Sequence, residues 1–201
     1  MGKGSPKVLM VALAWNLIYN IWLTWEVSMN IRGYDVVELA SFAQEKLGDR
    51  WGEMFLKAGL PLSPQSNAWY PLAAFCEVLE RMEQALGVDF GRIAWESGRY
   101  SVDKAARGPH RLLFFFASPL FIIKRTNALW GFYHDFGKVV ITPEGTSAVR
   151  FCLTGCPDLP EIYRHNIAGW VERALELAGG KDVKLEVLPR EGDLLPFHAS
   201  W

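Results

Sequence analysis

Apolar residues recur at helical spacing over the first two thirds of the chain. One face carries Val36, Leu39, Ala43 and Leu47, which predicts a helix that Gly48 ends. Asp35 and Glu38 have the spacing of a capping box, so we expect this helix to begin at Asp35 with its carboxylate bonded to first-turn amides.

The same spacing predicts further helices. They are expected at 51–58, at 71–86 after Pro71, near 90–104, at 109–117, at 119–134 after Pro119, and from a second capping box, Asp158 to Glu161, to Gly179-Gly180.

The period changes to that of strands after residue 137. Residues 138–153 form two β-rich runs around a Pro-Glu-Gly turn, which predicts a hairpin. Val183, Leu185 and Val187 alternate with charged residues, and a turn at 190–193 leads to a last strand that we expect to end with Trp201 packed in the core. The sequence therefore predicts an α+β fold, with helices packed on an antiparallel sheet built from two C-terminal hairpins.

Residues 8–27 form a separate hydrophobic stretch. A helix of this length is about 30 Å long, enough to cross a hydrocarbon core. Asn16, Asn20, Thr24 and Ser28 recur every four residues as one polar stripe, and the rest of the circumference is apolar. A membrane span, a buried core helix and a helix that docks on a partner are the three alternatives.

Composition narrows the class of protein. Half of the 201 residues are hydrophobic and the net charge is −1 with no basic run, so a nucleic-acid surface is not expected. The three cysteines are too few for a disulfide framework and favour a reducing compartment, hence the cytoplasmic side for the domain.

Motifs for chemistry are scarce. The sequence has no glycine-rich phosphate loop, nucleophile elbow or zinc-protease motif. Cys152 and Cys156, with His165 beyond them, lack an evident fourth ligand, so we expect no metal and read the cysteines as core or loop thiols. His110 and His165 are interpreted as surface residues, and His198 has no carboxylate or thiol beside it in the sequence.

One aromatic cluster is a candidate pocket. Trp130, Tyr133 and His134 follow one another at the end of a predicted helix. His134 is either a pocket polar group or axial ligand, or a helix C-terminal histidine that interacts with the helix dipole.

Three segments carry a resemblance to a known family. "WYPLAAFCEVLERMEQALG", "SPLFIIKRTNALWGFYHDFG" and "IAGWVERALELAGGKDVKLEVLPREGDLLPFHASW" resemble the bacterial 4-vinyl reductase (4VR) domain family over about residues 31–201. The resemblance implies an α+β fold shared with heme–nitric oxide sensor domains and TRAPP subunits. It also implies small hydrophobic or tetrapyrrole ligands, or an adaptor role, and one branch of the family is implicated in bacteriochlorophyll synthesis.

This chain departs from the family at one site. The family pattern places a cysteine four residues before the Gly-Asp and another three residues after the Asp, as a thiol or metal pair. Leu188 and Pro196 occupy those positions here, and neither binds metal. A retained fold without these site residues favours a binding or scaffolding role.

Because the resemblance begins near residue 31, residues 1–30 are expected to be an addition to a 4VR-like domain of residues 31–201. The central asparagines oppose a solitary lipid span, and an in-plane helix would need a charged face. We therefore expect a docking helix that attaches the protein to a membrane protein complex, with lipid contact on its apolar sides. The residues expected to dock are Trp15, Asn16, Tyr19, Asn20, Trp22, Thr24 and Trp25.

Two functions follow from these expectations. The first is a non-catalytic accessory or scaffold subunit of a larger membrane complex, for which the resemblance makes a photosynthetic complex one candidate host. The second is a sensor or carrier for a tetrapyrrole or small hydrophobic ligand, or a helper of bacteriochlorophyll vinyl reduction, that uses the pocket at Trp130, Tyr133 and His134.

Overall fold

The computed structural model describes residues 28–107 and 118–201. The docking residues predicted between Trp15 and Trp25, the helix expected at 109–117 and His110 all lie outside these ranges. No helix in the described ranges has the length and apolar character needed to cross a bilayer.

Helices dominate the first half of the described chain. In order, the elements are β1 (Asn30–Arg32), α2 (Gly33–Leu47), the short 3-10 helix η1 (Gly48–Arg50), α3 (Trp51–Lys57), β2 (Trp69–Pro71), α4 (Leu72–Leu86) and α5 (Arg92–Arg107). The second half is α7 (Pro119–Tyr133), β3 (Lys138–Pro143), β4 (Ala148–Thr154), α8 (Glu161–Leu177), β5 (Lys184–Val187) and β6 (Leu195–Ser200).

The predicted α+β fold is confirmed. The two C-terminal hairpins form one antiparallel four-stranded sheet in the order β3-β4-β6-β5, in which β4 and β6 join the hairpins. Val149, Phe151 and Leu153 alternate as buried positions along β4, so one face of the sheet packs on the core. The pairing of β5 with the last strand is also confirmed, and Trp201 packs against the core although it stays half-buried.

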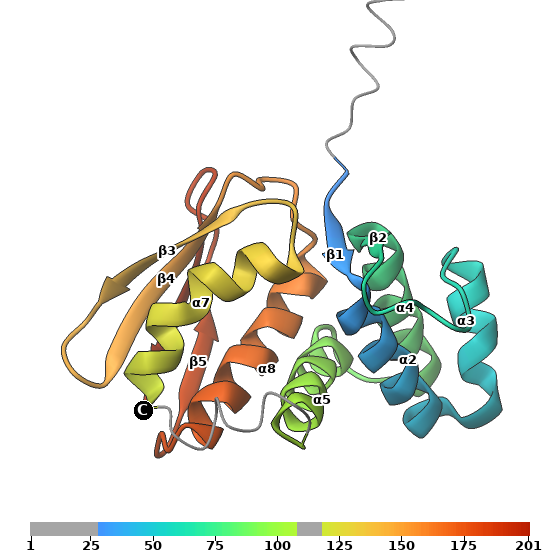
Figure 1. The fold of residues 1–201 in the computed structure, drawn as a ribbon, viewed down its shortest axis with the longest axis horizontal. Coiled ribbons are helices and arrows are strands. Elements are labelled where there is room, and N and C mark those ends of the chain that lie inside the picture. The colour runs from blue at the N-terminus through green and yellow to red at the C-terminus, as the bar shows by residue number, and fades with distance from the viewer. Residues whose placement is uncertain (1–27, 108–117) are drawn as a thin grey trace, which may run out of the picture.

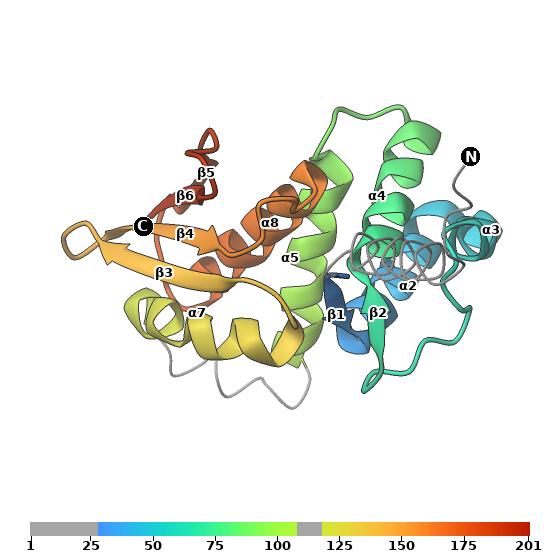
Figure 2. The ribbon, with the colours of Figure 1, turned by 90° about the horizontal axis from the view of Figure 1, so that it is seen from above.

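Helices cover the buried face of this sheet in layers (Figures 1 and 2). Helices α7 and α8 lie along it, α5 lies beside α8, and α2–α4 lie beyond α5. The close approach of α5 and α8 depends on glycine, because a Cβ added at Gly98 would lie 2.0 Å from the Asn166 carbonyl oxygen. A Cβ at Gly169 would lie 2.0 Å from the Trp95 carbonyl oxygen. Helix α8 therefore links the sheet to the helical half of the molecule.

A small sheet absent from the sequence prediction starts the described chain. Strands β1 and β2 pair antiparallel, and the amide of Gly33 donates to the Ala68 carbonyl oxygen at 2.8 Å. Because of this pairing, α2 begins at Gly33, two residues before Asp35, the predicted N-cap. Gly33 is required there, because a Cβ would lie 1.9 Å from the Gln65 carbonyl oxygen.

Both predicted capping boxes are wrong. At α2 the N-cap residue is Arg32, and at α8 it is Pro160, each in an extended conformation and without a side-chain cap. Asp35 therefore lies inside the first turn of α2, and Asp158 lies before α8. The start predicted for α7 is confirmed: Pro119 occupies the first turn and the Ser118 hydroxyl accepts from the Phe121 amide at 3.3 Å.

The first described residues are fastened to the end of α7. The Asn30 backbone amide and side-chain amide donate to the two carboxylate oxygens of Asp135, each at 2.7 Å, and the Asp135 amide donates back to the Asn30 carbonyl oxygen. Ile31 also bridges to His134, the C-cap residue of α7.

Candidate functional site

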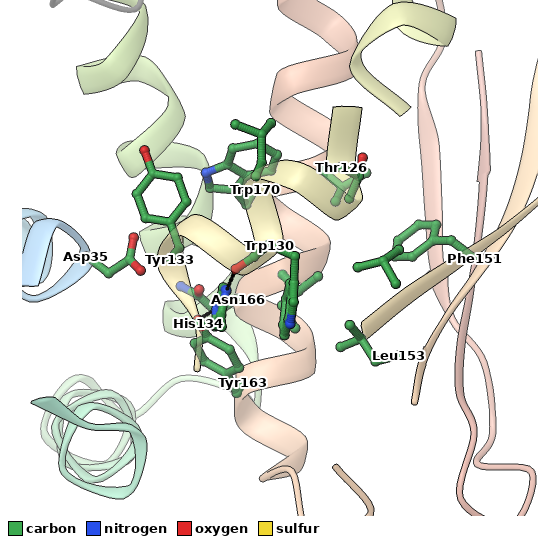
Figure 3. Close-up of a pocket in the computed structure, with 14 residues that line it drawn as sticks. Asp35, Thr126, Trp130, Tyr133, His134, Phe151, Leu153, Tyr163, Asn166 and Trp170 are labelled. Atoms are coloured by element: carbon green, nitrogen blue, oxygen red, sulfur yellow. Dashed lines mark hydrogen bonds between the residues drawn. The ribbon is translucent and has the colours of Figure 1, made fainter. Parts of the chain in front are cut away.

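A cavity of about 70 Å³ lies between α7, α8 and the sheet, with Asp35 of α2 at one end (Figure 3). The side chains that line it are mostly apolar or aromatic. They are Asp35, Thr126, Leu129, Trp130, Tyr133, His134, Val139, Phe151, Leu153, Tyr163, Asn166, Ile167, Trp170 and Val171. The structure thus brings the predicted residues Trp130, Tyr133 and His134 together in one cavity, and their role in binding stays a prediction.

The end of α7 fixes the cavity wall. The Trp130 ring is buried, and its indole N–H donates to the Phe136 carbonyl oxygen at 2.7 Å. The His134 ring stacks on it with 3.6 Å between centroids and 8° between planes. Both rings are therefore held in place by the turn that leads into β3.

His134 uses both ring nitrogens. Its Nδ1 lies 3.1 Å from the Trp130 carbonyl oxygen, and its Nε2 lies 2.6 Å from the Tyr163 hydroxyl oxygen. Because a carbonyl only accepts, Nδ1 carries the hydrogen and Nε2 accepts from the Tyr163 O–H. Burial lowers the pKa of His134 to about 3, so the ring is neutral at pH 7. His134 is thus the C-cap residue of α7 and also lines the cavity, but its neutral ring carries no charge to interact with the helix dipole. Its role as a ligand-binding group stays a prediction.

Tyr163 was missed by the sequence analysis. It is buried on α8, and its ring meets Phe75 edge-on at 5.8 Å. Burial, together with Asp35 and Cys76, raises the pKa of Tyr163 well above its usual value, so the hydroxyl keeps its proton and donates. A tyrosine inside the apolar stripe of α8 was the available signal, because a buried hydroxyl needs a partner.

Asp35 is the one acid that lines the cavity, and the charge of Glu38 on the same helix acts on it. Burial, followed by the charge of Glu38, raises the pKa of Asp35 well above its usual range. Burial raises the pKa of Glu38 to about 7, although a hydrogen bond from Ser101 and the charge of Lys104 oppose this. Burial and these two acids also raise the pKa of Tyr133 to about 12. The sequence had assigned Asp35 to helix capping, so this arrangement was missed as well.

Hydrogen bonds join the two positions at which the 4VR resemblance implies a cysteine pair. Leu188 and Pro196 face one another across the β5–β6 hairpin, where the Leu188 amide donates to the Pro196 carbonyl oxygen at 3.1 Å. The Arg164 guanidinium, only 1% exposed, donates from Nη2 to the carbonyl oxygens of Leu188 at 2.7 Å and Pro196 at 2.9 Å. Its Nη1 pairs with Glu161 at 2.8 Å. A buried arginine therefore cross-links the two backbone segments.

The remaining candidate residues lie apart from one another. Cys152 is half-buried on β4, and Cys156 is buried beyond it. His165 packs edge-on against Phe90, and His198 lies 3.3 Å from the Glu144 carboxylate, a neighbour that the sequence did not indicate. Across residues 28–107 and 118–201, no three His, Cys, Asp or Glu side chains gather closely enough to hold a metal ion.

Comparison with solved structures assigns the architecture. An H-NOX protein from S. oneidensis in the Fe(II)NO state aligns with TM-score 0.67 and 10% identity over 84% of this chain and 98% of its own. The Fe(II) unliganded H-NOX protein from K. algicida aligns with TM-score 0.66 and 11% identity over 84% and 95%. The fold is that of the H-NOX domains. No protein-family model matches the sequence, and no curated protein is significantly similar to it.

A further H-NOX structure, from work on heme distortion, aligns with TM-score 0.65 and 12% identity over 85% and 94%. The cavity residues do not fit a heme in this arrangement, because the Nε2 lone pair of His134 is occupied by the Tyr163 hydroxyl. The cavity is also small, since pockets for drug-sized ligands measure about 300–1,000 Å³. No chemistry through a heme is derived for this site.

Proposed function

We propose that the protein is a non-catalytic accessory subunit, built on a 4VR-like domain and attached through residues 8–27 to a larger membrane-embedded complex. The observation that carries the proposal is the Arg164 cross-link between Leu188 and Pro196. It puts a structural contact where the 4VR resemblance implies a thiol or metal pair. A domain whose β5–β6 hairpin is held by a structural contact at these two positions suits a scaffold better than a catalyst.

The attachment rests on the composition of the N-terminal segment. Trp15, Trp22 and Trp25 offer large anchoring surfaces of the kind found at interface hot spots, and Asn16 and Asn20 supply hydrogen-bonding groups for a partner helix. A photosynthetic complex is one candidate host through the 4VR resemblance. The absence of a disulfide framework favours the cytoplasmic side for the domain.

Deletion of residues 1–27 tests the attachment. The deletion stops there because the Met29 carbonyl oxygen accepts from the Leu72 amide and Asn30 bonds to Asp135. We expect a folded, soluble domain, checked by circular dichroism, that no longer co-purifies with membranes or with the partner subunits of the full-length chain. A deletion variant that keeps the same partners would overturn the proposal.

The Asn16→Leu, Asn20→Leu double variant separates docking from simple lipid insertion. If the asparagines pair with a partner helix, the variant loses the partner, because the partner's polar groups are left unpaired. If the helix only meets lipid, the variant is retained more strongly, because two desolvation penalties are removed. Stronger retention with an unchanged set of co-purified proteins would contradict docking.

A second candidate function is a ligand sensor or carrier, and the aromatic cavity is the observation that favours it. A tetrapyrrole would require the cavity to open and Tyr163 to release His134. An absorption spectrum of the protein purified from its native membranes tests this, since a Soret or chlorin band would favour a tetrapyrrole carrier or a helper of vinyl reduction over the scaffold.

A further inference from the structure

The Asp35 carboxyl group has an unusual position among the acids of this domain. It points from α2 toward Tyr133 and the side chains of α7 and α8, at one end of the cavity (Figure 3). Because α2 begins at Gly33, the carboxyl group does not cap the helix. Within residues 28–107 and 118–201, no hydrogen bond or ion pair joins the Asp35 side chain to another residue.

Glu83 shows how the fold otherwise treats a buried acid. It is 5% exposed, and its carboxylate accepts from the backbone amides of Gly91 at 3.1 Å and Ile93 at 3.0 Å, at the start of α5. More exposed acids pair with arginine or lysine, as Glu176 does with Arg99 and Arg173. A partly buried carboxyl group without such a partner is costly, and its environment is suited to an added cation.

The charged and titratable groups around Asp35 leave it without a counter-ion. Glu38 of the same helix adds negative charge, and Lys104 of α5 acts on Glu38. Helix α7 contributes Tyr133 and His134, which are neutral at pH 7, and α8 contributes neutral Tyr163.

We propose that this cavity binds a small quaternary ammonium ion, with the Asp35 carboxylate as its counter-ion and Trp130, Tyr133 and Trp170 among its walls. Quaternary ammonium ions are weakly hydrated and are attracted to aromatic rings, so they suit an apolar cavity with one acid. The volume of about 70 Å³ exceeds the roughly 10–15 Å³ that one water needs, so the cavity has room for the head group of such an ion.

A neutral ligand of the same shape would contact the same aromatic walls but would not compensate the negative charge of the Asp35 carboxylate. A cation stabilises the charged form of Asp35, whose pKa is raised in the empty cavity by burial and Glu38. Binding should therefore release a proton at a pH at which Asp35 is protonated in the empty cavity, which a neutral ligand would not do. The proposal goes beyond attachment to a complex and does not depend on it.

The test compares tetramethylammonium chloride with tert-butanol, a neutral molecule with the same count of non-hydrogen atoms. Isothermal titration calorimetry of the full-length chain in a non-ionic detergent, in two buffers with different ionisation enthalpies, gives both the affinity and the protons released. We expect tetramethylammonium to bind at least about tenfold more tightly than tert-butanol, with proton release. Equal affinity for the two, or no binding of tetramethylammonium, would overturn the proposal.

Asp35→Asn tests whether Asp35 causes the preference for tetramethylammonium over tert-butanol, because it keeps the shape of the side chain and removes the charge. We expect this variant to lose most of the preference for the cation and to bind without proton release, because only the aromatic walls still favour the cation. Glu45→Gln is the matched control on the same helix, since Glu45 is exposed and bonds to Tyr100 and Lys104 instead of lining the cavity. An undiminished preference in Asp35→Asn, or a preference lost in Glu45→Gln, contradicts the assignment. If Asp35→Asn does not fold, the two-probe comparison on the unaltered chain still decides the proposal.

Discussion

Replacing Arg164 by leucine tests whether the guanidinium holds the last hairpin on α8. The arginine contributes two hydrogen bonds to backbone carbonyls of the β5–β6 hairpin and one ion pair to Glu161, and it lies over the Phe197 ring at 5.1 Å. Leucine keeps much of the apolar stem and none of the donors.

The expected loss of stability follows from the groups left behind. A buried carbonyl without a donor costs about 1–3 kcal/mol. The Leu188 carbonyl oxygen loses the donor that Arg164 supplied, whereas the Pro196 carbonyl oxygen still accepts from the Leu188 amide. The arginine Nε has no partner among the described residues, so its removal relieves one cost. The ion pair to Glu161 adds little, because the Glu161 side chain is 41% exposed and also pairs with Arg190. We expect a net destabilisation of about 1–3 kcal/mol, which is less than the whole stability of an ordinary domain.

Urea unfolding followed by circular dichroism measures this loss, and a shift of the midpoint by about 0.5–1.5 M is expected for a typical slope. Arg150→Leu is the matched control, because Arg150 reaches the turn of the same hairpin through a surface pair with Glu191. That pair should contribute less than about 1 kcal/mol. Equal losses in the free energy of unfolding for Arg164→Leu and Arg150→Leu would refute the role of Arg164 in holding the hairpin.

Three further predictions concern the cavity and the helix crossing. Tyr163→Phe should lower the free energy of unfolding by about 1–3 kcal/mol at pH 7, measured by urea unfolding, because it leaves His134 Nε2 without its donor. Tyr100→Phe, at a partly exposed hydroxyl, should lower it less, and equal losses would contradict the contact between Tyr163 and His134. The low pKa of His134 means that the unfolded chain binds a proton that the folded one excludes, so stability due to this group falls as pH drops from 6.5 toward 3. The stability gap between the unaltered chain and His134→Gln should therefore shrink by up to about 1.4 kcal/mol per pH unit below 6.5, and a constant gap would refute the assignment. Gly98→Ala should destabilise the protein by about 1–3 kcal/mol or more. Gly131→Ala, with open space around it on α7, should stabilise the protein by about 0.5–1 kcal/mol. Melting temperatures of the two variants that move in the same direction would contradict this.

The period of apolar residues predicted most of the fold because that signal is local. The alternation of Val183, Leu185 and Val187 identified β5, and the stripe that includes Phe75 and Leu79 identified α4. Strands β1 and β2 have three residues each, too few for a period to appear. The capping-box motif gave the wrong start for α2. The helix start is set instead by the pairing of β1 with β2 and by the hydrogen bond from the Gly33 amide to the Ala68 carbonyl oxygen.

The candidate site was harder to predict, because its parts come from distant segments. Trp130, Tyr133 and His134 are close in sequence and were found by that closeness. Asp35 and Tyr163 reach the same cavity only after α2 and α8 pack around α7 and α5. No pattern within a single segment contains that information.

The bonds between Asn30 and Asp135 have a mechanical consequence. Two short hydrogen bonds join the residue that follows the N-terminal segment to the residue that follows His134. A pull on residues 1–27 therefore loads the start of α4, through the bond between the Leu72 amide and the Met29 carbonyl oxygen, and the end of α7. If the segment is held by a partner, tension on it would act on the wall of the cavity and on its stacked Trp130–His134 pair. The start of the described chain and the wall of the cavity thus lie on one force-bearing path.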